Sequence, residues 1–151
     1  MKKVYQTVVD KGHGNCMQAV IASLLDLDLD KVPNFIECGD EWYNVFDDFI
    51  YKYGYESNYI QGSTDILLGV AQFDNGVNGY FYGVVNSQTF EGITHAVIVD
   101  RYLNIIHDPN PNGKALFLSP DDVIGIYAMH PIRIDINGIC YTPKHYNLTH
   151  K

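Results

Sequence analysis

Three residues far apart in the chain, Cys16, His95 and Asp108, have side chains that together could carry out nucleophilic catalysis. In such a set the cysteine sulfur attacks, the imidazole takes its proton, and the carboxylate holds the imidazole in one tautomer. Residues so distant in sequence can act together only if the elements that contain them meet in space. The sequence around each residue therefore decides whether the idea is reasonable.

Cys16 stands at the predicted start of a helix. The turn-rich stretch KGHGN precedes it, and an apolar run over residues 16–27 follows. Asn15 is predicted to cap this helix, with Gln18 completing a capping box. At the first helical position, free backbone N–H groups and the helix dipole favour negative charge, which lowers a thiol pKa. Cysteine is also a common core residue, so this position alone favours a nucleophile and a packing role equally.

The first half of the chain is predicted to be mainly helical. Residues 16–27 are apolar on nearly every face, which predicts a helix buried at the centre of the protein. Residues 40–53 carry apolar side chains three and four apart, which predicts a one-faced helix beginning at Asp40 and ended by Gly54. Three further segments are expected to be an extended start, a strand and a short helix, over residues 1–10, 55–61 and 65–73.

The second half is rich in β-branched and aromatic residues between turn-forming residues, which predicts strands. The expected strands cover residues 79–86, 94–101, 103–107, 125–130 and 132–141. Asn137–Gly138 and the stretch IVDRYLNII are each expected to form a tight hairpin. Helices followed by strands predict an α+β fold, with a helical half packed on an antiparallel sheet. A chain of 151 residues predicts one domain over residues 1–151.

The hairpin around Arg101–Tyr102 is expected to bring His95 and Asp108 together, because the two residues are about equally far from the bend. The hairpin would then place a general base, His95, next to a carboxylate, Asp108, that accepts a hydrogen bond from the second ring nitrogen of the histidine. A histidine at a strand edge is by itself more often structural. Its pairing with Asp108, in a chain that also has Cys16 at a helix start, favours the catalytic interpretation.

Other interpretations of the polar residues were weighed. His107 and Asp108 are neighbours on a predicted strand, so their side chains should point to opposite faces, and neither a metal site nor a cofactor is expected. His13 is close to Cys16 but lies between two glycines, which is typical of a loop residue. The tyrosines of the middle of the chain are expected on half-buried surfaces or, alternatively, along a substrate groove: Tyr51, Tyr53, Tyr55, Tyr59, Tyr80 and Tyr82.

Composition limits the partners. The formal charge of −8 disfavours nucleic acid, whose phosphates need a basic surface. Neither a signal peptide nor an apolar run of membrane-spanning length is visible, so a cytoplasmic protein without a membrane partner is expected. The cysteines form no CxxC pair and are expected to be free thiols, with a Cys38–Cys140 disulfide left open. Oligomeric state is not indicated.

The stretch GHGNCMQAVIASLLDLDLDKVPNF, with HAVIVD and IIHDPNP later, resembles the papain-like cysteine peptidases. It is most similar to the compact bacterial and phage branch that includes bacteriocin-leader (double-glycine) peptidases. The resemblance covers residues 6–35 and 92–111, and it implies a papain-like fold. It also implies four roles: Cys16 as nucleophile, His95 as base, Asp108 as orienting carboxylate and Gln6 as oxyanion donor.

The match departs from papain in several places. Gln6 lies further before the cysteine than the corresponding papain glutamine, so the loop between them must double back. Met17 and Asp108 stand where papain has an aromatic residue and an asparagine, which fits the bacterial branch.

The resemblance implies hydrolysis of a peptide, isopeptide or other amide bond in a peptide, protein or small-molecule substrate. An acyl transferase would use the same residues. A third possibility is a non-catalytic binding protein that keeps the fold, for example a phage factor acting on a host protein in the host cytoplasm. These three classes remain open at this point, because one set of residues serves them all.

Overall fold

The computed structural model describes residues 1–61 and 76–132 and shows an α+β protein. Its two α-helices are α1 (Cys16–Leu24) and α2 (Trp42–Lys52). Its five strands are β1 (Tyr55–Gln61), β2 (Tyr80–Asn86), β3 (Thr94–Asp100), β4 (Ile105–His107) and β5 (Val123–Pro131). In the described part of the chain, no helix is long and apolar enough to cross a membrane.

The strands form one antiparallel sheet in the order β1-β5-β2-β3-β4. Five of the predicted strands fall in the described residues, and all five are confirmed, as is the hairpin of the stretch IVDRYLNII. Three predicted features lie outside the described residues: the helix at 65–73, the strand at 132–141 with its Asn137–Gly138 turn, and Cys140. The segment at 1–10, expected to be extended, joins no strand of the sheet.

Helix α1 is buried as predicted, because its apolar side chains contact neighbours all round. Residues 19–23 are fully buried. The helix ends at Leu24 rather than at Leu27, since the chain leaves the helical path and Asp26 adopts a left-handed φ of 55°. The predicted capping box is wrong, because the Asn15 side chain makes no cap hydrogen bond and is used elsewhere.

The second helix also begins later than predicted. A 3₁₀ stretch, Phe35–Glu41, precedes α2, and Gly39 within it has a non-helical backbone with φ 61° and ψ −133°. That conformation interrupts the helical path, so Asp40 is not the cap and α2 begins at Trp42. The predicted end is confirmed, because Gly54 follows the helix with a φ of 89°, which glycine adopts without a steric penalty.

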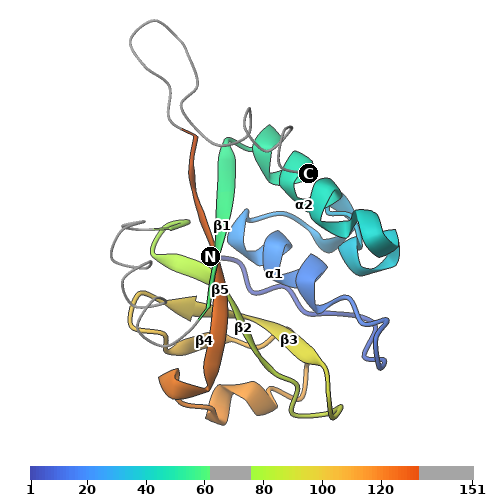
Figure 1. Ribbon diagram of the computed structural model, residues 1–151, viewed down its shortest axis with the longest axis vertical. Helices are drawn as coiled ribbons and strands as arrows, with labels where there is room; N and C mark the ends of the chain where they lie inside the picture. Colours follow the sequence, from blue (N-terminus) through green and yellow to red (C-terminus); the bar gives the residue numbers. More distant parts are fainter. Residues whose placement is uncertain (62–75, 133–151) are drawn as a thin grey trace, which may run out of the picture.

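Both helices lie on the same side of the sheet, with α1 nearest β3 and β2 (Figure 1). The two helices therefore cover one face of the sheet and leave the second face to be covered by other residues. The second face is buried by Phe81, Val85, Val97, Ile126 and Ala128 together with Ala115 from the loop between β4 and β5. Because α1 begins beside β3, its first residue lies next to the sheet strand that carries His95.

Candidate active site

His95 and Asp108 form a direct contact, as predicted. The Nε2 atom of the imidazole lies 2.6 Å from Oδ1 of the carboxylate. Both side chains are largely buried, with 13% of His95 and 2% of Asp108 exposed. Asp108 also accepts hydrogen bonds from the backbone N–H groups of Asn110 and Ala115, each at 2.9 Å. Three donors thus hold this carboxylate in one orientation and favour its charged form.

His95 and Asp108 do not meet in the strand register that their equal distances from the bend predicted. In the β3–β4 ladder, Ile98 lies opposite His107, and the register then shifts at a β-bulge. A continued ladder would place Asp108 opposite Val97. Asp108 instead lies just past the end of β4, where the loop to Ala115 turns its carboxylate back toward His95.

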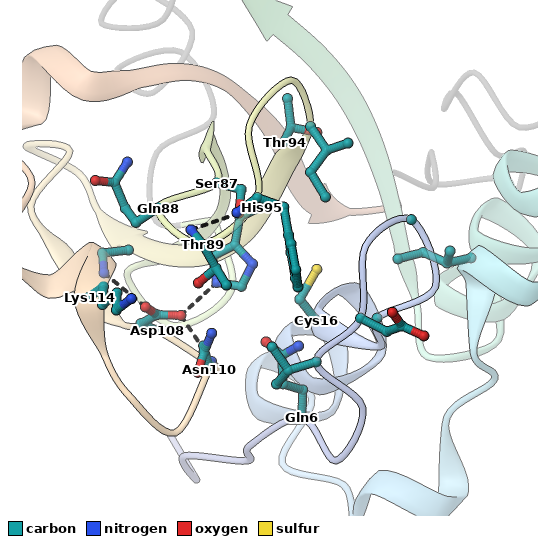
Figure 2. A pocket seen from close by; sticks show the side chains of 18 residues that line it. Gln6, Cys16, Ser87, Gln88, Thr89, Thr94, His95, Asp108, Asn110 and Lys114 are labelled. Atoms are coloured by element: carbon teal, nitrogen blue, oxygen red, sulfur yellow. Dashed lines mark hydrogen bonds and ion pairs between the residues drawn. The ribbon is translucent and has the colours of Figure 1, made fainter.

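Cys16 lies beside His95, at the first residue of α1. Figure 2 shows the carboxylate of Asp108, the imidazole of His95 and the sulfur of Cys16 in a row, with the imidazole in the middle. Burial raises the pKa of the Cys16 thiol, but the hydrogen bond and positive charge of His95 lower it, and backbone hydrogen bonds from Ala96 and Met17 lower it further. The result is a pKa below the ordinary value, so the site favours a thiolate.

The pKa values of His95 and Asp108 are also shifted, each in the direction that favours its charged form. Burial opposes the charge on His95, but the hydrogen bonds from its ring to Asp108 and Cys16 raise its pKa to about 9. For Asp108, burial raises the pKa, while the His95 bond and the backbone donors outweigh it and leave the pKa below its usual value. The three pKa shifts therefore all favour the charged forms, a thiolate, an imidazolium and a carboxylate.

Gln6 is brought to the same place because the N-terminal segment doubles back. The backbone N–H of Gln6 donates to the carbonyl of Pro109, immediately after Asp108, at 2.9 Å. Its side-chain Nε2 donates to the carbonyl of Val8 at 2.8 Å, and its Oε1 is buried without a partner among the described residues. In Figure 2 the amide of Gln6 lies close below Cys16.

Asn15 and His107 hold the N-terminal segment that carries Gln6, a role that the sequence did not predict for either residue. Oδ1 of Asn15 accepts from the backbone N–H groups of Thr7 and Val8, at 3.0 and 2.8 Å, and Asn15 is almost fully buried. Nε2 of His107 donates to the carbonyl of Val4 at 2.7 Å. The position of Asn15 directly before the cysteine could have indicated a role in the site, but the sequence favoured helix capping as the simpler interpretation.

The remaining candidates occupy separate positions. His107 and Asp108 do point apart, toward Val4 and His95 respectively. His13 is exposed in the turn before α1. Cys38 is a free thiol whose sulfur contacts the carbonyl of Asn34 at 3.5 Å. Within residues 1–61 and 76–132, no three His, Cys, Asp or Glu side chains come together as metal ligands would.

Two cavities meet at the Cys16–His95 pair. The first, the polar cavity, is shown in Figure 2 and is lined by Gln6, Asp10, Ser87, Gln88, Thr89 and Lys114 besides the pair itself. The second, the aromatic cavity, is lined by Trp42, Tyr59, Tyr82 and Tyr127 together with the pair. The sulfur of Cys16 therefore borders two cavities, the first with more polar side chains and the second with more aromatic ones.

No protein-family model, curated protein or solved structure matches this chain. The resemblance to papain-like peptidases thus remains a prediction from the motifs. What the site can do follows from its own geometry, which combines an activated thiol, a charged histidine and an orienting carboxylate.

Proposed function

We propose that this protein is a cysteine-dependent hydrolase of amide bonds, acting through Cys16, His95 and Asp108. The observation that carries the proposal is the row of carboxylate, imidazole and thiol at the start of a buried helix (Figure 2). The pKa shifts of all three groups favour the charged forms that nucleophilic catalysis uses. The substrate class is a peptide, an isopeptide or another amide.

The reaction begins with attack by the Cys16 thiolate on the amide carbonyl carbon. A carbon–sulfur bond forms, and the carbonyl electron pair moves to the oxygen. When the tetrahedral intermediate collapses, the carbon–nitrogen bond breaks and the His95 imidazolium gives its proton to the departing amine. Water then attacks the thioester while His95 takes a proton from it, which releases the acid and restores the thiolate.

Gln6 is proposed to stabilise the oxyanion of that intermediate. One of its two side-chain N–H groups donates to Val8, which leaves the second for a substrate oxygen near Cys16. The amide is largely buried and borders the polar cavity. A fixed donor in a site with little water stabilises a developing negative charge more than water does.

The proposal includes the papain-like fold that the motifs resemble, with the acyl transferase as the second candidate on the same residues. The two activities differ only in whether water or an amine attacks the thioester. Adding a primary amine to the reaction and analysing the products by mass spectrometry would separate them.

The direct test is the reactivity of the three cysteines with iodoacetamide near pH 6. An ordinary thiol with a pKa of about 8.5 is almost wholly protonated there, whereas Cys16 is expected to react quickly because it is held as a thiolate. Peptide mass spectrometry assigns the label, with Cys38 as the control. If Cys16 labels no faster than Cys38, the proposed nucleophile is wrong. If it labels quickly but Cys16→Ala retains biological activity, the non-catalytic binding protein is the better interpretation.

A further inference from the structure

The aromatic residues of the cavity beside Cys16 come from four separate elements. Trp42 begins α2, Tyr59 is on β1, Tyr82 is on β2 and Tyr127 is on β5. Its volume is about 370 Å³, within the range of pockets that hold small organic groups. Because Cys16 and His95 form part of its wall, whatever occupies it lies next to the reacting sulfur.

The three tyrosines form a row across the helix-covered face of the sheet. Tyr127 lies opposite Tyr59 in one ladder and opposite Tyr82 in the next, with ring centroids 4.5 and 4.7 Å apart. Trp42 stands nearly perpendicular to Tyr127, at 87°. Gly125 makes room for the row, since a Cβ there would lie 2.5 Å from the hydroxyl of Tyr59. The cavity therefore has aromatic walls in two orientations.

The charges around this cavity favour a cation. The lowered pKa of Cys16 favours a thiolate in the wall of this cavity, and the carboxylate of Asp108, bonded to the far side of the His95 ring, offsets the positive charge of the imidazolium. Among the described residues, no lysine or arginine lines the aromatic cavity. Tyr82 and Cys16 both line this cavity. Faces of Trp and Tyr attract cations through the ring quadrupole, most strongly where water is excluded.

We propose that the aromatic cavity is a specificity site for a cationic group, such as a lysine, arginine or alkylammonium side chain of the substrate. This inference rests on the proposed function, because it assigns part of the substrate of the same cysteine. The acyl or amine part of the substrate that enters the cavity would carry the positive charge. The polar cavity on the other side of Cys16 would receive the remainder.

Four methanethiosulfonate reagents test the proposal without a known substrate. They carry a trimethylammonium-ethyl, a sulfonate-ethyl, a benzyl or a methyl group, and each rate with Cys16 is divided by its rate with free cysteine. In the reaction the thiolate bonds to the sulfenyl sulfur, and methanesulfinate leaves with the electron pair. Peptide mass spectrometry assigns the label. We expect the normalised trimethylammonium rate to exceed both the sulfonate and the benzyl rates by about fivefold or more.

A matched pair of variants separates the cavity from the general negative charge of the protein. Tyr59 and Tyr53 are each 44% exposed, but only Tyr59 lines the aromatic cavity. Tyr59→Leu and Trp42→Leu should each lower the trimethylammonium rate about fivefold and leave the methyl rate unchanged, while Tyr53→Leu should change neither. Circular dichroism at each condition shows that the variants are folded.

The outcomes are distinct. A benzyl rate above the trimethylammonium rate would overturn the proposal in favour of an apolar side chain. A trimethylammonium preference that survives in both Tyr59→Leu and Trp42→Leu would also overturn it, because the preference would then come from overall charge. A slow methyl rate at Cys16, no faster than at Cys38, would instead contradict the proposed function, whatever the charge preference.

Discussion

Nε2 of His95 donates to Oδ1 of Asp108 across 2.6 Å, and this contact decides which ring nitrogen faces the cysteine. The pKa of Asp108 is lowered, so its oxygen accepts and the proton belongs to Nε2. Only Nδ1 is then left to exchange a proton with Cys16. The carboxylate thus acts by holding one tautomer and one ring orientation, which is the part that an orienting residue has in such a triad.

Removing the carboxylate should affect both activity and stability. In Asp108→Ala, the imidazole loses its acceptor, and the N–H groups of Asn110 and Ala115 are left buried without a partner. We expect the free energy of unfolding to fall by about 3 kcal/mol in urea titrations. Labelling of Cys16 at pH 6 should also slow, though less than in His95→Ala, which removes the base itself. Equal rates for Asp108→Ala and the unchanged protein would contradict the orienting role.

Gln6→Ala should separate oxyanion stabilisation from thiol activation. Alkylation of Cys16 by iodoacetamide forms no oxyanion, so its rate should stay within about twofold of the unchanged protein. Acylation by a p-nitrophenyl ester does form one, and its rate should fall about 100-fold or more. Stopped-flow measurement of the nitrophenol burst gives the second rate. If both rates fall together, Gln6 positions the loop and is not the oxyanion donor.

Asn15 is expected to be a positioning residue. Asn15→Ala leaves the N–H groups of Thr7 and Val8 without their acceptor, which should cost about 1–3 kcal/mol of stability and displace Gln6. Asn15→Asp retains an acceptor oxygen at the same place, so it should restore most of the stability and of the burst rate. A failure of Asn15→Asp to restore either would mean that the amide of Asn15, which contacts Gln18, matters more than its oxygen.

The pH dependence of stability offers a test of the ion pair. The raised pKa of His95 stabilises the fold fully below 6.5, its unfolded value, and this contribution is lost as the pH rises through about 9. The lowered pKa of Cys16 contributes stability above 9.0, its unfolded value, and this is lost as the pH falls through the lower folded value. At pH values between the lowered pKa of Cys16 and 9, the two contributions change in opposite directions, so they partly cancel.

Replacing the cysteine removes that cancellation. In Cys16→Ser only His95 remains, so the free energy of unfolding should fall as the pH rises above 6.5, by up to about 1.4 kcal/mol per pH unit. The decline should end below pH 9, because the contribution of Cys16 to the His95 pKa is lost as well. Urea titrations between pH 6 and 9 measure both proteins. A difference between them that does not vary with pH would show that Cys16 is not a thiolate in the folded state.

Local sequence patterns predicted most of the described elements correctly, but not their ends. The apolar residues of α1 cover all its faces, and that alone indicated its central position. Its end at Leu24 depended on Asp26, whose left-handed backbone no spacing indicates. For α2, Gly39 within the preceding 3₁₀ stretch displaced the start from Asp40 to Trp42. Ends of helices depend on single residues and their tertiary contacts, whereas their existence depends on a pattern over many residues.

For the site, the nearness of His95 and Asp108 was predictable because a short hairpin brings β3 and β4 together, but the contact itself depends on the loop after β4, which turns the carboxylate toward His95. The position of Gln6 was not, because it depends on a loop held by Asn15 and His107 through hydrogen bonds to backbone atoms. Backbone atoms are the same in every residue, so sequence carries no mark of such a partner. The Asn15 side chain had a plausible local use as a cap, and only the folded chain shows the other one.

The sequence by itself determined the kinds of reactive group present, the α+β class, and the placing of Cys16 at the start of a buried helix. These follow from side-chain chemistry and from periodic patterns that act over a few residues. The tertiary structure alone decided the directions in which the pKa values of Cys16 and His95 shift, and the joining of Trp42, Tyr59, Tyr82 and Tyr127 into one cavity. Burial and charge act through space, and residues from α2, β1, β2 and β5 become neighbours only when the sheet and helices have packed.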